Sequence, residues 1–202
     1  MQAGTIPKSI QVRKWDLSGL QGISDATLET HFGLYEGYVK NVNLLFERLA
    51  DLRETDKAQG SNQQYAELVR RLGFEYNGVR LHEQYFDNMT RRPQDVGSGK
   101  LHDALGASYG GFEQWKKDFM AVAGMRGIGW AIAYYDLANR SVTNMWINEH
   151  QNGNLAGALP LVVLDVWEHA FIKDYKPSEK AKYVEAFFAN VDWKACEGRI
   201  PA

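Results

Sequence analysis

Asp165 and His169 are the residues whose types and spacing first suggest chemistry, because they stand four apart in the segment LDVWEHAF. If the chain is helical there, both side chains project from one helix face, where a carboxylate oxygen and an imidazole nitrogen can bind one metal ion. Such a pair is more often solvated or hydrogen-bonded. Here it follows the apolar run VVL, and an unpaired carboxylate in apolar surroundings is costly. The pair therefore predicts a metal ion or another buried partner.

Two further histidines, His31 and His82, fall in segments of helical periodicity in the first half of the chain. Each has an alternative interpretation as a core or surface histidine bonded to backbone. If the four groups converge from three helices, three imidazoles and one carboxylate suit a redox-active first-row metal. The set has no thiolate, which disfavours an iron–sulfur cluster or a structural zinc site. His102 lies on an amphipathic segment and is expected at the surface.

The first half of the chain must supply the helices for His31 and His82. Capping residues and apolar positions at helical spacing predict one long helix over residues 24–52. A polar, glycine-containing stretch then breaks it. Residues 64–90 are predicted as one interrupted helix or two successive helices, with Asn77-Gly78 as the interruption. These elements predict a helical hairpin.

The second half begins after a linker rich in Pro, Gly and Ser at residues 91–100. Two short amphipathic helices are expected next, then a β-hairpin over residues 129–150 and a short buried strand over 159–166, with helices to the end. The predicted fold class is α+β, with a small three-stranded antiparallel sheet among helices. We expect residues 1–93 to form an N-terminal helical hairpin domain and 94–202 a C-terminal α/β domain, with the metal site between them.

Composition excludes several classes of protein. The formal net charge is -2 with both signs interspersed, so the chain lacks the basic surface that drives nucleic-acid binding. Its start has no apolar core of signal-peptide length, and it contains no run of about 18 apolar residues that would span a bilayer. We therefore expect a soluble, cytoplasmic protein without nucleic-acid or membrane partners. The lone Cys196 cannot form an internal disulfide and is expected to be a small packing residue.

The segment DVWEHAF resembles the C-terminal signature of the iron/manganese superoxide dismutases. Its residues Asp165, Trp167, Glu168, His169 and Ala170 match the family's fixed positions. The segments LETHFGLYEGYVKN, NGVRLHEQYF and GIGWAIAYYD resemble other parts of the family in the right order, so the likeness covers most of the chain. The positions carried over are the ligands His31 and His82, the gateway tyrosine Tyr38, the aromatic positions Tyr85 and Phe86, and Trp130 as a pocket wall beside Trp167.

This resemblance implies the fold, the reaction and the metal ligands His31, His82, Asp165 and His169. A single iron or manganese ion would cycle between its +3 and +2 states, oxidising one superoxide ion to dioxygen and reducing a second to hydrogen peroxide. By the same resemblance, Asp165 accepts a hydrogen bond from a solvent molecule at the metal, to which a nearby amide or imidazole donates.

By the same resemblance, His150 is the residue expected to donate to the solvent molecule at the metal. The family supplies the donor either four residues before the second histidine ligand, where this chain has Gly78, or from the loop NEHQNGN. We therefore assign His150 to a hydrogen-bond relay that joins the solvent molecule to Tyr38. The alternative is that His150 is an exposed loop histidine.

Three features depart from the family pattern. His31 and Tyr38 are seven residues apart instead of eight, so we expect a regular α-helix, without a π-bulge, to place both on one face. Where most members have a histidine and a tyrosine that bond between subunits, this chain has Tyr35 or Leu34, and Ile172. Glu168 remains, and by resemblance it would reach His169 of the partner subunit, so we still expect a homodimer.

Two questions stay open in the sequence: whether the metal is iron or manganese, and whether the protein is catalytically active. Val163 is bulkier than the glycine common in manganese members, which favours iron slightly over manganese. A di-iron carboxylate protein is disfavoured because it needs Glu-x-x-His pairs that this sequence lacks. The remaining alternative is a catalytically silent metal-binding relative that acts as a structural or interaction module.

Overall fold

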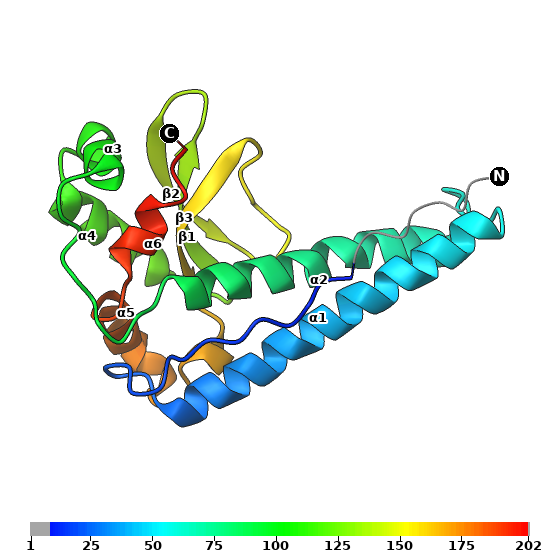
Figure 1. Cartoon of the computed structure of the whole chain (residues 1–202), viewed down its shortest axis with the longest axis horizontal. Helices are drawn as coiled ribbons and strands as arrows, with labels where there is room; N and C mark the ends of the chain where they lie inside the picture. Colours follow the sequence, from blue (N-terminus) through cyan, green and yellow to red (C-terminus); the bar gives the residue numbers. More distant parts are fainter. Residues whose placement is uncertain (1–8, 202) are drawn as a thin grey trace.

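A long helical hairpin forms the N-terminal part of the computed structural model, which describes residues 9–201. Helix α1 spans Asp25–Glu54, and the Ser24 side chain caps its start by accepting from the Thr27 N–H. Helix α2 spans Gln63–Asp87, with Asn62 in the same capping role. The two helices run antiparallel and extend away from the rest of the molecule (Figure 1). The predicted hairpin is confirmed.

Helix α2 is continuous through Gly78, so the interruption expected at Asn77-Gly78 is wrong. The reason is that Gly78 is present for close packing and not to end a helix. A Cβ atom at this position would lie 2.7 Å from Cδ1 of Tyr38 on α1. Gly78 therefore lets the Tyr38 ring lie directly against the backbone of α2.

The C-terminal part contains a three-stranded antiparallel sheet with the order β2-β1-β3. Its strands are β1 (Trp130–Asp136), β2 (Ser141–Ile147) and β3 (Ala158–Asp165). The central strand β1 is buried along nearly its whole length, as its continuous apolar sequence requires. Its first residue, Trp130, pairs with Asp165, the last residue of β3. The predicted α+β fold with this sheet is confirmed.

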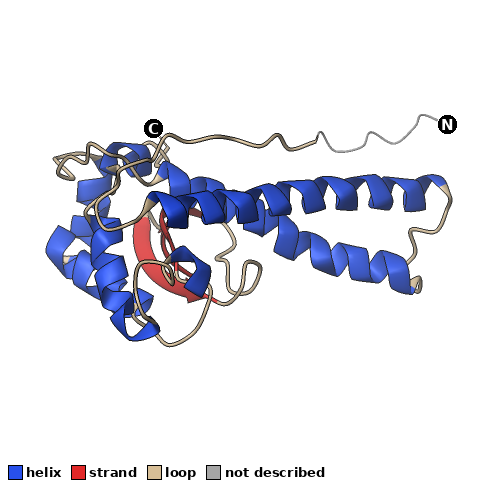
Figure 2. Ribbon diagram, turned by 90° about the horizontal axis from the view of Figure 1, so that it is seen from below, coloured by secondary structure: helices blue, strands red, loops and turns tan. Residues whose placement is uncertain are grey.

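Short helices gather on the side of the sheet opposite to the direction in which the long hairpin extends, on the left in Figures 1 and 2. Their bounds are α3 Lys100–Tyr109, α4 Phe112–Ala123, α5 Lys180–Phe188 and α6 Trp193–Glu197, with 3-10 turns η1 at Glu168–Ala170 and η2 at Pro177–Glu179. Among the helices of residues 9–201, none is both long and apolar enough to cross a bilayer.

The half-buried Arg199 joins the end of α2 to β3. Its guanidinium donates to the backbone oxygens of Gln84 and Leu161 and to Oδ1 of Asn88. Asn88 in turn donates from Nδ2 to the Val163 carbonyl at 2.7 Å. Since α2 carries His82 and β3 ends at Asp165, these bonds hold two of the sequence-predicted site residues in a fixed relation.

Candidate metal centre

The four candidate ligands come together in one cluster, with one ligand atom from each lying within 4.8 Å of the others. The Nε2 atoms of His31, His82 and His169 lie 3.1, 3.7 and 3.2 Å from the same Oδ2 atom of Asp165. The side chains of His31, His82 and Asp165 are fully buried, whereas that of His169 keeps 22% of its surface exposed. The cluster is therefore closed on the helix side and open beside His169.

The local structure at Asp165 and His169 differs from the predicted helix face. Asp165 is the last residue of β3, and His169 lies in the 3-10 turn η1. The backbone N–H of Trp167 donates to Asp165 Oδ1 at 2.8 Å, which leaves Oδ2 directed at the three histidines. The expectation that three helices supply the four groups was thus wrong: α1, α2, a strand end and a turn supply them.

The unpaired ring nitrogen of His82 shows that the four side chains fit a metal ion. Its Nδ1–H donates to the Gly78 carbonyl at 2.6 Å, so its Nε2 carries a lone pair directed into the cluster. Within the described part of the chain, this fully buried Nε2 has no hydrogen-bond partner. A buried polar atom left unpaired costs about 1–3 kcal/mol, which a metal–nitrogen bond would remove.

The spacing of the four groups also fits one ion. Two ligand atoms that each lie about 2.1 Å from one metal ion can be at most about 4.2 Å apart. The distances from the Asp165 oxygen to the His31 and His82 nitrogens, 3.1 and 3.7 Å, lie below that limit. These side chains would need only small adjustments to hold a metal.

The charges in the cluster are arranged for a cation. Burial raises the pKa of the Asp165 carboxyl, but His169 and His31 outweigh burial and hold that pKa well below its usual range. Burial lowers the pKa values of His31 and His82, so both are neutral. For His169 burial lowers the pKa, but the Asp165 carboxylate raises it by more. A metal cation beside Asp165 would take the place of a proton on His169.

Three aromatic rings lie against the histidines of the cluster. Phe86 lies 5.1 Å from the His31 ring, Trp130 lies 5.0 Å from the His82 ring, and Trp167 stacks 5.9 Å from the His169 ring, all between centroids. These rings make the surroundings apolar, which strengthens electrostatic interactions inside.

Tyr85 and Tyr183 support the Asp165 end of the site, and the Tyr85 ring also lies 5.0 Å from the His31 ring between centroids. The Tyr183 hydroxyl donates to the Asp165 backbone carbonyl at 2.8 Å. The Tyr85 hydroxyl is hydrogen-bonded to the Tyr183 hydroxyl at 3.0 Å. Tyr183 was missed in the sequence, because it lies in the amphipathic helix α5, where an aromatic residue is typical of the core. Arg199 was missed for a similar reason, since the hydrogen bonds of one arginine to distant backbone carbonyls leave no signal in the sequence.

His150 and Tyr38 lie beside the cluster and contact each other. His150 is fully buried, and its Nε2 lies 2.8 Å from the Tyr38 hydroxyl. Its Nδ1 lies 3.0 Å from the indole nitrogen of Trp130. Burial lowers the pKa of His150 to about 4 and raises the pKa of Tyr38 to about 12. The exposed-loop alternative for His150 is therefore wrong, and both groups are uncharged at neutral pH.

Helix α1 is α-helical over its whole length, which confirms the regular geometry predicted from the spacing of His31 and Tyr38. Between Leu34 and Tyr35, only Leu34 is exposed. Tyr35 is buried and donates to Oε1 of Glu83 at 3.1 Å. His102 is exposed, as predicted.

Glu168 and Ile172 are the two positions in the second half where the resemblance places contacts between subunits. Both side chains are exposed to solvent in the single chain.

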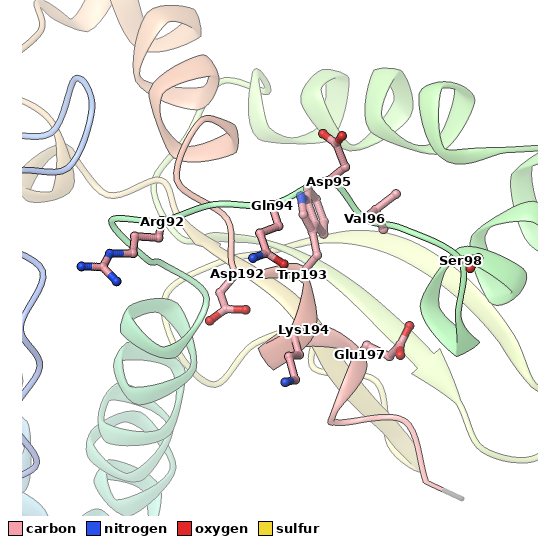
Figure 3. A pocket seen from close by; sticks show the side chains of 9 residues that line it. All are labelled: Arg92, Gln94, Asp95, Val96, Ser98, Asp192, Trp193, Lys194 and Glu197. Carbon is pink, nitrogen blue, oxygen red and sulfur yellow. The ribbon is translucent and has the colours of Figure 1, made fainter.

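A separate hollow of about 320 Å³ lies between residues 92–98 and α6 (Figure 3). Two of its carboxylates accept hydrogen bonds from backbone N–H groups at the N-termini of helices. Asp192 accepts from the Ala195 N–H at the start of α6, and Glu197 accepts from the Leu101 N–H at the start of α3. This hollow therefore offers no second cluster of free ligands comparable with the metal centre.

Three imidazoles and one carboxylate, most of them buried, form a cluster that could hold a metal ion, and such a donor set suits redox-active first-row metals. Comparison with known proteins then gives the family. Residues 97–199 match the model of the C-terminal domain of the iron/manganese superoxide dismutases. The chain belongs to this family and is an oxidoreductase that disproportionates superoxide.

Individual relatives are similar over most of their length. "Superoxide dismutase [Fe]" of Aquifex pyrophilus is 36% identical over 184 residues, which are 90% of this chain and 85% of that protein. "Superoxide dismutase [Mn] 2" of Haloferax volcanii is 35% identical over 172 residues, 85% of this chain and 83% of the relative. "Superoxide dismutase [Fe]" of Saccharolobus solfataricus is 32% identical over 205 residues, 95% of each.

Proposed function

We propose that His31, His82, Asp165 and His169 hold one iron or manganese ion, and that superoxide is disproportionated there. The observation that carries this proposal is the approach of three imidazole nitrogens to one Asp165 oxygen, with His82 Nε2 otherwise unpaired. In the balanced reaction, two superoxide ions and two protons give one dioxygen and one hydrogen peroxide. No observation favours the catalytically silent alternative.

The bound ion would supply a one-electron couple between its +3 and +2 states. The residues of the chain supply binding, water exclusion and a proton. Phe86, Trp130 and Trp167 place apolar ring surface against His31, His82 and His169, which limits the contact of the cluster with bulk water to the side of His169. The Tyr38 hydroxyl, whose pKa burial raises to about 12, stays protonated at neutral pH and offers an O–H beside the site. His150 holds that hydroxyl in place through its Nε2.

The ligand set is tested by metal content in a matched pair of variants. His82→Gln should reduce the bound iron or manganese at least ~10-fold, since replacing even a residue behind the ligands costs about that much. His102→Gln, which alters an exposed histidine on α3, should keep the wild-type metal content and activity. Equal metal contents in the two variants would contradict the assignment of His82.

We propose that iron is slightly favoured over manganese. The support is Val163, which is fully buried in β3 two residues before Asp165 and has its carbonyl bonded to Asn88. The relatives carry either metal in their names, so the comparisons leave both open. Reconstitution of metal-free protein with each ion separately, followed by activity per bound ion, would decide. Higher activity with manganese would refute the preference.

We also propose a cytoplasmic homodimer, with residues 1–93 and 94–202 as its two domains. The exposed side chains of Leu34, Glu168 and Ile172 support a partner at the open side of the site. Cys196 is buried and unpaired, which suits a reducing compartment. Sedimentation at micromolar concentration should give a dimer, and a monomer would count against the role of Glu168.

A further inference from the structure

Residues 10–18, here called the strap, precede α1 and run beside it without forming a helix or strand (Figure 1). Ile10 and Asn43 exchange two hydrogen bonds of 2.8 Å, and Trp15 donates from Nε1 to Oδ1 of Asp87 at 2.7 Å. These bonds fix the strap on the helical hairpin. A hollow of about 470 Å³, here called the strap groove, lies between residues 15–18 and the start of α1. Its volume is in the range of ligand-binding sites.

The walls of the strap groove are largely apolar. The rings of Trp15 and Phe32 are half-buried and stack with their centroids 6.1 Å apart. Leu17 and Leu28 complete the apolar lining. Gly33 leaves the groove open toward α1, because a Cβ atom at this position would meet no atom of a neighbouring segment within 4 Å. The groove therefore has an aromatic wall with space beside it.

All charged side chains that line the strap groove are carboxylates, namely those of Asp16, Asp25, Glu29 and Glu36. Two of them are already bonded within the chain. Asp25 accepts from the Ser18 hydroxyl and from the Gly19 N–H, and Asp16 pairs with Arg91 at 2.6 Å. A groove lined by charges of one sign favours an occupant of the opposite charge.

Glu29 and Glu36 are the two carboxylates left for a partner. Both are exposed, and within residues 9–201 the ion pairs of lysine and arginine involve other carboxylates. The two glutamates are seven residues apart on α1, so they share one face of the helix and lie about 10.5 Å apart along its axis. Two cationic side chains at a similar separation would match them.

The aromatic wall and the two spaced carboxylates together indicate the conformation of the occupant. Polyproline II segments bind to aromatic-lined grooves. In this conformation residues three apart lie on the same side, about 9 Å from each other. That separation is close to the spacing of Glu29 and Glu36 along α1.

We propose that the strap groove is a docking site for a basic, proline-containing segment of another protein. Two lysine or arginine side chains three residues apart in this segment pair with Glu29 and Glu36. The apolar residues between them pack on Trp15 and Phe32.

A second copy of this chain is a poorer occupant, by charge and by position. A two-fold axis through the groove would set carboxylates against carboxylates. At about 100° per residue, Glu29 and Glu36 point about 140° and 160° away from Leu34, which lies on the side proposed for the homodimer. The strap groove and the proposed dimer surface therefore use different faces of α1.

Fluorescence anisotropy of labelled peptides with metal-loaded, full-length protein tests the proposal. The probe is Ser-Lys-Leu-Pro-Lys-Ser, and its isomer Ser-Lys-Lys-Leu-Pro-Ser has the same charge but adjacent lysines. We expect the probe to bind with a Kd below about 1 mM and about 5-fold more tightly than the isomer. Equal binding of the two peptides, or no binding of either, would overturn the proposal. Displacement of the probe by an equal concentration of spermidine would also overturn it, because charge alone would then be recognised.

Charge variants of α1 test the two glutamates. Glu29→Gln and Glu36→Gln should each weaken binding of the probe about 3-fold, as expected for the loss of one exposed ion pair. Glu47→Gln removes the same charge from an exposed position of α1 outside the groove and should leave the Kd unchanged. Equal effects of the three variants would contradict the pairing. Superoxide activity should be the same in wild type and Glu29→Gln, so the proposed function is tested separately.

Gly33→Leu and Gly37→Leu form a matched pair that tests where the peptide lies. Both glycines are on α1, and an added Cβ would have open space at each, so both variants should fold. Only Gly33 lines the strap groove. Gly33→Leu should therefore abolish binding of the probe, and Gly37→Leu should keep it. Unchanged binding by Gly33→Leu would overturn the placement of the site.

Discussion

Gly78→Ala tests how closely the gateway tyrosine packs on α2. Gly78 lies in the interior of the helix, four residues before His82. An added Cβ would lie 2.7, 2.9 and 3.0 Å from three atoms of the Tyr38 ring. The ring would have to move, and with it the hydroxyl that lies 2.8 Å from His150.

Gly73 offers a matched control in the same helix. A Cβ there meets only Cβ of Gln151 at 3.7 Å, which is ordinary contact. Gly73→Ala should therefore stabilise the protein by about 1 kcal/mol, the usual helix-propensity gain. Gly78→Ala has the same gain, but overpacking costs about 1–3 kcal/mol and the lost hydrogen bond about 1 kcal/mol. We expect it to be less stable than Gly73→Ala by about 2–4 kcal/mol on these figures.

The assay is urea unfolding of wild type, Gly73→Ala and Gly78→Ala at one fixed metal concentration, because bound metal adds apparent stability. Tryptophan fluorescence and circular dichroism should give coincident transitions. If both alanine variants gained the same stability, the close contact between Gly78 and Tyr38 would be refuted.

Two further predictions concern His150 and Arg199. The pKa of His150 is about 4 in the folded protein and about 6.5 in an unfolded chain, so between pH 7 and 5 only the unfolded chain takes up the proton. Wild type should lose about 2 kcal/mol more than His150→Gln over that range in urea unfolding, and equal losses would contradict a buried neutral ring. Arg199→Met should cost about 3 kcal/mol by the same method, because it removes the three hydrogen bonds that Arg199 donates to Gln84, Asn88 and Leu161. A change below about 0.5 kcal/mol would refute the role of Arg199 in joining α2 to β3.

Helix periodicity was sufficient to predict the hairpin, and the β-rich runs of the second half added the sheet that makes the fold α+β. Apolar positions repeat along α1 and α2, and capping residues such as Ser24 mark where the helices begin. The spacing of His31 and Tyr38 also predicted a regular helix correctly, because seven residues return to nearly the same face. These are local properties, which a single sequence contains.

Long-range packing decided what the sequence could not predict. Gly78 was interpreted as a helix break because its contact with Tyr38 comes from another helix. Asp165 and His169 were placed on one helix face, whereas pairing with β1 extends the chain as strand up to Asp165 itself. Tyr183 and Arg199 act through bonds to backbone carbonyls distant in sequence, and such bonds have no sequence signal.

The stoichiometry of superoxide consumption tests the central claim most directly. The metal-loaded protein should remove superoxide rapidly and release one hydrogen peroxide and one dioxygen for every two superoxide ions, and His82→Gln should lose this activity. One hydrogen peroxide for each superoxide would indicate reduction at the expense of an outside donor. That result, or a metal-loaded protein that leaves superoxide decay unchanged, would contradict the account.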